Sequence, residues 1–209
     1  MDIANLKTIA LNDPYKRHHS TSITEVREGR RLLLKESLFS PTLSGQPNDL
    51  GTLVLDDYDE IQVLDVRYED NGLWHYVSRG SSLRRGQSLT CHLDWDRRLA
   101  FMRAHTAAVL VSGLGCRQWE CLVSSCNITE SHIRVDFSCG YMPVSEVMAL
   151  YESANVAIAK GYRVSTENID TERLKGRPEL LRCQRRSKNP PLAGVKVHHH
   201  GGVIPVHLS

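Results

Sequence analysis

Histidines are the side chains in this sequence best suited to metal chemistry, and their spacing decides what they could do. His105 precedes Thr106 in a stretch whose apolar residues recur every three or four positions, which is typical of a helix. By itself, His105 is a partly buried helix histidine held by one hydrogen bond, or a candidate metal ligand.

Further candidate ligands lie near the end of the chain. No cysteine is followed four residues later by a histidine, and no two histidines have that spacing. Neighbouring residues of a strand face opposite sides, so of three adjacent histidines only His198 and His200 could share an ion with His105. We take His200 and His207 as candidate replacement ligands. The alternative is an exposed histidine-rich tail.

Two motifs carry a resemblance to a known family. The first covers residues 98–107 and reads R-x-x-x-M-R-x-H-T-A, with His105 and Thr106 inside it. The second covers residues 37–51 and matches T-x-F-Y-P-x-G-G-G-Q-P-x-D-x-G at Phe39, Pro41, Gly45, Gln46, Pro47, Asp49 and Gly51. Together they resemble the editing domain of alanyl-tRNA synthetases and the free-standing, AlaX-type alanyl-tRNA editing proteins. Leu43 and Ser44 replace two of the family's loop glycines, which predicts a reshaped loop.

The resemblance implies an activity and a cofactor. The family hydrolyses the ester that joins serine or glycine to mischarged alanine tRNA, without ATP, and binds zinc through H-x-x-x-H and a later C-x-x-x-H. Val109 and the missing C-x-x-x-H leave that zinc site incomplete here. Thr106 would lie near the aminoacyl group, and Gln46 could bond the amino acid or the terminal adenosine. The plain alternatives are a helix threonine and a turn glutamine in water.

The C-terminal part of the chain is expected to lack the C-x-x-x-H motif, and it carries a basic block of Lys and Arg residues. The resemblance places the C-x-x-x-H segment near residue 208 or beyond, so we expect a truncated or diverged C-terminus before Ser209. From Arg173 onward there are eight Lys or Arg residues and one acid, Glu179. Such a block could neutralise RNA phosphates, and a solvated tail is the alternative. The candidate RNA contacts are Arg182, Arg185 and Arg186.

Length and composition bound the class of protein. The chain has 209 residues, 24% charged and 41% hydrophobic, which is ordinary for a soluble protein and leaves no room for an aminoacylation core. We expect no bilayer-spanning segment, no secretory signal and mostly reduced, buried cysteines, which together indicate a cytoplasmic protein without a membrane partner. The oligomeric state stays open.

The expected fold class is α+β, with a small N-terminal β-barrel over residues 1–93 followed by a helix-backed antiparallel-sheet editing domain over residues 94–209. Short strands separated by turns predict the barrel, at residues 22–26, 31–34, 52–55, 61–66, 73–77 and 88–93. After residue 96 we expect a helix stopped by Gly113 to Gly115, and strands near 120–124 and 131–137. A long helix ended by Lys160 and Gly161 and a strand at 162–166 would follow.

Two function classes remain. One is a trans-editing hydrolase, of full or impaired activity, that deacylates mischarged alanine tRNA. The other is a non-catalytic relative that binds tRNA or a synthetase through the basic block.

Overall fold

The structure is a computed structural model that describes residues 9–43, 45–56, 59–70, 72–79, 83–169, 195–200 and 204–208. Its contacts divide the chain into two compact units, one of residues 5–102 and one of residues 1–4 and 103–209. The first unit holds the barrel, and the second holds most of the helical part. The predicted domain boundary between residues 93 and 94 stays a prediction.

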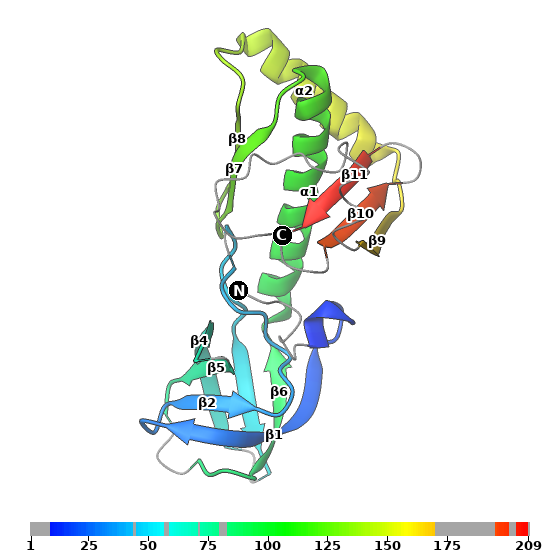
Figure 1. The fold of residues 1–209 in the computed structure, drawn as a ribbon. Coiled ribbons are helices and arrows are strands. Elements are labelled where there is room, and N and C mark those ends of the chain that lie inside the picture. Colours follow the sequence, from blue (N-terminus) through cyan, green and yellow to red (C-terminus); the bar gives the residue numbers. More distant parts are fainter. Residues whose placement is uncertain are drawn as a thin grey trace. The chain divides into compact units, whose positions relative to one another are not determined.

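Six antiparallel strands close a barrel in the first unit (Figure 1). They are β1 (His18–Arg27), β2 (Arg31–Leu34), β3 (Gly51–Leu55), β4 (Glu60–Glu69), β5 (Gly72–Val77) and β6 (Ser88–Leu93), after a short 3-10 helix, η2 (Ile9–Leu11). The strands follow the order β1-β2-β5-β4-β3-β6, and β6 pairs with β1 to complete the closure. The predicted barrel is confirmed.

Strand β4 shows how the sequence directs side chains into the barrel. Alternation places Ile61 and Val63 inside, where each is at most 2% exposed. A register shift between Val63 and Asp65 then makes Val66, rather than Asp65, the next buried residue. The bulge keeps a carboxylate out of the barrel core.

Helix α1 (Trp95–Gln118) corrects the predicted stop at Gly113 to Gly115. The helix continues through both glycines. A Cβ atom built on Gly115 would lie 2.5 Å from Cζ of Phe137, which is closer than real side chains allow. Gly115 is therefore a point of close packing within the helix, and the prediction of a stop was wrong because it treated the glycines as local signals only.

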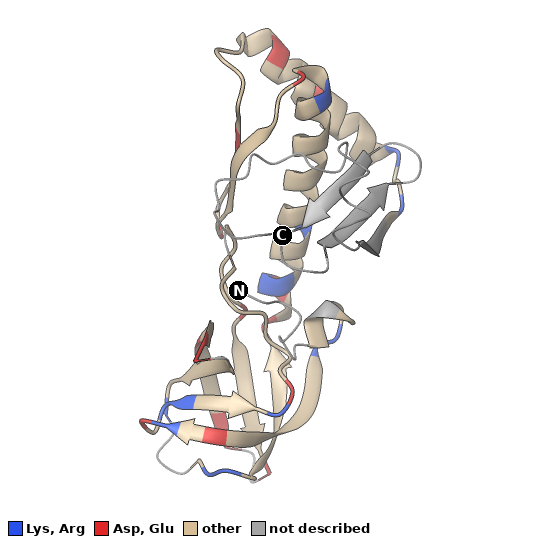
Figure 2. Ribbon diagram, viewed as in Figure 1, with Lys and Arg blue, Asp and Glu red and all other residues tan. Residues whose placement is uncertain are grey.

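Helix α1 is also long and apolar enough to cross a membrane, judged by length and composition alone. Figure 2 shows few charged residues along α1 and α2. The expectation that no segment spans a bilayer therefore stays a prediction. One such helix is weak support for a membrane span, because the core helix of a soluble protein passes the same test, and 33% of this window is buried.

The second unit combines α1 with a hairpin, a helix and a three-stranded sheet. Its elements are β7 (Val123–Ile128), β8 (Ile133–Phe137), α2 (Val144–Ala159), β9 (Val164–Ile169), β10 (Val195–His200) and β11 (Ile204–Leu208). Strands β7 and β8 pair with each other, and the other sheet has the order β11-β10-β9. Helix α2 ends at Lys160 and Gly161, as predicted, with Gly161 at φ +62°. The predicted α+β class is confirmed.

Cysteine burial differs from the expectation. The five cysteines in the described part of the chain are all free thiols, but only Cys91 is buried. Cys116, Cys121 and Cys139 are half-buried, and Cys126 is exposed. These four thiols lie in the second unit, Cys116 on α1 and the other three on or beside the β7–β8 hairpin.

Candidate functional site

A buried ion pair joins the two sequence motifs. Arg98, on the first turn of α1, donates Nε to Oδ1 of Asp49 at 2.9 Å and also donates Nη2 to Oδ2. Asp49 is 3% exposed and Arg98 5%. The remaining guanidinium donors bond the carbonyls of Pro14, at 3.0 Å, and Leu38, at 3.2 Å. Every charged group of the pair is therefore satisfied away from water.

Three further hydrogen bonds stabilise the loop and the start of α1. The backbone N–H of Ser40 donates to Oδ2 of Asp49 at 2.6 Å, which bends the loop onto its own carboxylate. Arg97 donates Nε to the carbonyl of Asn48 at 3.1 Å. Asp94 caps the helix by accepting the N–H of Arg97 at 3.1 Å. Hydrogen bonds therefore connect the loop directly to the first turn of α1.

Gly51 explains why the loop motif ends on a glycine. A Cβ atom at this position would lie 2.1 Å from the carbonyl oxygen of His92 and 2.9 Å from Cε1 of Phe39. Only glycine permits β3 to start this close to β6. This motif residue therefore has a structural role.

Gln46 sits in a tight turn of the same loop. Its backbone N–H and carbonyl each pair with Leu43 at 3.0 Å, around Gly45, which has φ +87°. The side chain of Gln46 is half-buried. The retained glycine supplies the positive φ that the turn requires.

His105 and Thr106 lie on α1 within the second unit, whereas Gln46 belongs to the first. His105 is half-buried and Thr106 is exposed. Val109, one turn after His105, packs against the cluster formed by Leu110 and Ala154. The position that carries the family's second zinc ligand is therefore part of the apolar contact between α1 and α2.

Within the described residues, no three His, Cys, Asp or Glu side chains lie where they could hold a metal ion. His105 alone does not fit a zinc site, which takes at least three protein ligands. The predicted ligands His200 and His207 lie in β10 and β11, where the backbone register pairs them with Ile204 and Val197 respectively. Their role as ligands stays a prediction.

The predicted RNA contacts Arg182, Arg185 and Arg186 lie outside the described residues, as does Cys183. Their roles also stay predictions.

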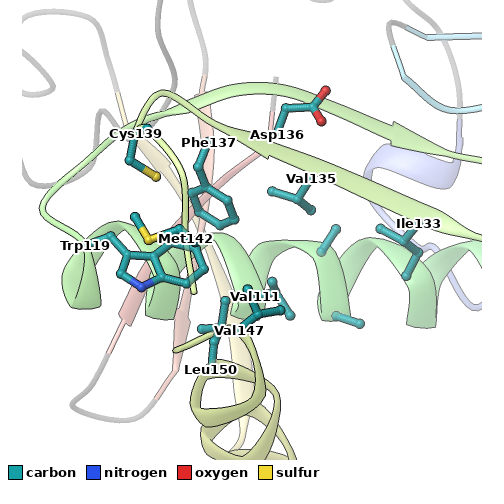
Figure 3. Close-up of a pocket in the computed structure, with 13 residues that line it drawn as sticks. Val111, Trp119, Ile133, Val135, Asp136, Phe137, Cys139, Met142, Val147 and Leu150 are labelled. Carbon is teal, nitrogen blue, oxygen red and sulfur yellow. The ribbon is translucent and has the colours of Figure 1, made fainter. Parts of the chain in front are cut away.

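A hollow of about 500 Å³ lies in the second unit between α1, the β7–β8 hairpin and α2 (Figure 3). Ala107 and Ala108, which follow Thr106 directly, form part of its wall. Trp119 and Phe137 are in edge-to-face contact in its wall, with ring centroids 5.0 Å apart. This mostly apolar hollow could take a small apolar or flat group.

One carboxylate, Asp136, borders the hollow. Arg134 donates Nε to it at 2.8 Å and Ser125 donates Oγ at 2.8 Å. The hydrogen bond from Arg134, followed by that from Ser125, holds the pKa of Asp136 below its ordinary value. Sequence reasoning missed this hollow because its walls come from three separate elements.

A second buried polar group lies beneath the loop motif. His75 is fully buried, with Nδ1 against the carbonyl of Leu32 at 3.2 Å and Nε2 against Oγ of Ser37 at 2.8 Å. A carbonyl only accepts, so Nδ1 carries the proton. Burial lowers the pKa of His75 to about 4, so the ring is neutral at physiological pH. It is a structural histidine of the barrel core.

Comparison with known proteins agrees with the two motifs. No protein-family profile matches the chain. The chain is 26% identical over 202 residues to the alanyl-tRNA editing protein AlaX-M of Saccharolobus solfataricus, covering 92% of this chain and 84% of that protein. It is 29% identical over 131 residues to AlaX-M of Pyrococcus horikoshii, covering 60% of this chain and 58% of that protein.

A larger relative shows the same similarity over a small part of its length. The alanine–tRNA ligase of Hyperthermus butylicus is 32% identical over 164 residues, which is 76% of this chain and 17% of the ligase. The predicted resemblance is confirmed: the chain is homologous to alanyl-tRNA editing proteins and to a region of alanine–tRNA ligases. These homologues are proteins of translation, and those that align over most of their length carry the editing name.

Proposed function

We propose that this chain edits alanine tRNA in trans, hydrolysing the ester of tRNA mischarged with serine or glycine. The observation that supports this most is the buried pair of Arg98 and Asp49, which ties the loop motif to the helix motif. The pair holds the two motif segments in one defined arrangement. The homology to alanyl-tRNA editing proteins points the same way.

Three side chains are assigned to the reaction. Thr106, exposed on α1, would contact the amino acid through its hydroxyl and discriminate serine or glycine from alanine. His105 would orient the water that attacks the ester carbonyl, and the ribose hydroxyl would leave. Gln46 would bond the amino acid or the terminal adenosine. Partial charge on the carbonyl oxygen grows in the transition state, so donors placed there accelerate the step.

No step is assigned to zinc. The donor set of the described residues does not fit this ion, because Val109 packs against Leu110 and Ala154 where a ligand is needed. The reaction partner is tRNA, and the place of action is the cytoplasm with the translation apparatus.

The test is deacylation of seryl-, glycyl- and alanyl-tRNA by the full chain. We expect faster loss of serine or glycine than of alanine. Thr106→Val should remove this preference and Thr106→Ser should retain it, because only the first loses the hydroxyl. His105→Ala should lower the rate by roughly 100-fold with little change in tRNA affinity, as expected for a lost transition-state contact. Equal rates for wild type and His105→Ala would contradict the assignment.

The packing of Val109 favours a second candidate, a non-catalytic relative that binds tRNA or a synthetase. An apolar residue at that position suits a helix interface better than a reaction centre. Wild-type protein that binds tRNA but deacylates it at the uncatalysed rate would support this candidate and reject the hydrolase.

A further inference from the structure

Two cysteines face each other at the open end of the β7–β8 hairpin. The N–H of Ser138 donates to the carbonyl of Leu122 at 2.7 Å, and the N–H of Leu122 donates to Oγ of Ser138 at 3.0 Å. This pairing extends the hairpin beyond the ends of its strands. One step further along the same antiparallel register, Cys121 lies opposite Cys139.

The register brings the two thiols within bonding reach. Opposed residues in an antiparallel pair have Cα atoms about 4.5–5.5 Å apart, inside the range of about 4.4–6.8 Å that a disulfide spans. The side chains of Cys121 and Cys139 are hydrogen-bonded, and the backbone N–H of Cys139 also bonds the sulfur of Cys121. Both residues are half-buried free thiols. The spacing of opposed residues in an antiparallel pair is therefore compatible with a disulfide between them.

We propose that Cys121 and Cys139 are a dithiol site that closes into a cross-strand disulfide by exchange with a small disulfide such as oxidised glutathione. The thiolate of one cysteine attacks a glutathione sulfur, and one glutathione thiolate leaves. The second cysteine gives its proton to solvent and attacks the protein sulfur of the mixed disulfide, releasing the other glutathione. Two protein thiols are oxidised, and one glutathione disulfide is reduced to two thiols.

The environment of Cys121 sets the conditions for this exchange. Burial raises the pKa of Cys121 to about 11, and the hydrogen bond with Cys139 adds to the effect. Little thiolate is present at Cys121 near neutral pH, so this thiol attacks a disulfide slowly.

Closure of the pair would act on the hollow of the second unit. Cys139 lines that hollow, and Figure 3 shows its side chain beside Phe137 at the end where Trp119 and Met142 lie. A disulfide would fix the segment after β8 and hold this wall in one position. The site is independent of the proposed editing function, because it uses none of His105, Thr106 or Gln46.

Cys116 is the competing thiol, since its charge also acts on Cys121. The alternative link, between Cys116 and Cys121, would tie α1 to the segment before β7. The two links give different peptides, so mapping separates them.

The experiment equilibrates the full chain with reduced and oxidised glutathione, blocks free thiols by alkylation, and identifies linked peptides by mass spectrometry. We expect the Cys121–Cys139 peptide to predominate. It should persist in Cys116→Ser and in the control Cys126→Ser, whose thiol is exposed on the same hairpin. It should be absent in Cys121→Ser and Cys139→Ser.

The wild-type chain provides a test that needs no variant. The folded protein should form the Cys121–Cys139 link at least about tenfold more readily than the chain unfolded in urea, because the fold supplies the local concentration. A predominant Cys116–Cys121 link, or equal formation in folded and unfolded protein, would overturn the proposal.

Discussion

Arg98 donates two hydrogen bonds to the carboxylate of Asp49, a residue 49 positions earlier in the chain, and both side chains are buried. The pair connects the loop before β3 to the first turn of α1. The other donors of Arg98 bond two backbone carbonyls. These bonds fix the orientation of the guanidinium, so the pair depends on its geometry as well as on its charges.

Removing one partner should therefore be costly. Arg98→Met leaves the Asp49 carboxylate buried without its countercharge, and we expect a loss of about 3–5 kcal/mol in the free energy of unfolding, measured in urea. The double variant Arg98→Met with Asp49→Leu should recover part of that loss. The exposed pair of Arg134 and Asp136 is the control, and Arg134→Gln should leave stability unchanged. A near-neutral Arg98→Met would show that the pair contributes little.

Gly115→Ala should destabilise the second unit although alanine favours helices. The gain in helix propensity is about 1 kcal/mol, while the clash with Phe137 forces repacking that costs about 1–3 kcal/mol. Adding Phe137→Leu should relieve the clash. Gly140→Ala, outside the helices, controls for the added methyl group alone, because a Cβ atom there meets nothing within 4 Å. Thermal unfolding of the variants measures the difference, and a stabilised Gly115→Ala would contradict the packing argument.

His75 should make the barrel sensitive to mild acid. Its pKa is about 4 in the folded protein and 6.5 ordinarily, so the unfolded chain takes up the proton first as pH falls. The difference in pKa contributes roughly 3 kcal/mol to the free energy of unfolding. This contribution is fully present above pH 6.5 and is lost as the pH falls towards 4. Urea unfolding between pH 4 and 6.5 should show the free energy of unfolding rising with pH, and His75→Gln should flatten this dependence.

Zinc content tests the interpretation of Val109. We expect less than one zinc per chain in the purified protein, measured by elemental analysis, because His105 has no ligand one turn away. Val109→His should not by itself create a tightly held ion, and Val109→Ala controls for lost packing. One firmly bound zinc per wild-type chain would contradict the prediction.

Salt dependence tests the basic block. Changing Arg182, Arg185 and Arg186 together to Gln should weaken tRNA binding and lower the slope of log affinity against log salt, because fewer phosphates are neutralised. Filter binding at several salt concentrations measures both quantities. An unchanged slope would assign the block to a solvated tail.

The barrel could be predicted from sequence because alternation and turns are local signals. The strands at residues 31–34 and 88–93 were predicted at their observed bounds, and β1 and β4 proved longer than predicted. Alternation alone would have placed Asp65 inside the barrel, and only the pairing of β4 with β5 reveals the bulge. Register irregularities depend on neighbouring strands, which a single segment does not specify.

The candidate site was harder to derive. Both Asp49 and Arg98 lie in recognised motifs, yet nothing in either motif says that they form a pair. The glycines near residue 115 were taken for a helix end because their partner, Phe137, is distant in sequence. The same limit applies to Cys121 and Cys139, which become neighbours only through the hairpin register. Contacts between segments decide these features, and local propensity does not.

The closure of the barrel between its first and last strands has a consequence for synthesis. The pairing of β1 with β6 joins His18 to His92, so every other barrel strand must be made before the ring can close. Until then β1 has an unpaired edge on a growing chain. Pairing between such distant segments is slow. Arg98, whose side chain bonds Asp49 of the loop, is synthesised only after β6. Residues 88–98 therefore supply both the closing strand and the arginine that bonds the loop, and a nascent chain stalled before β6 would carry an open, association-prone sheet.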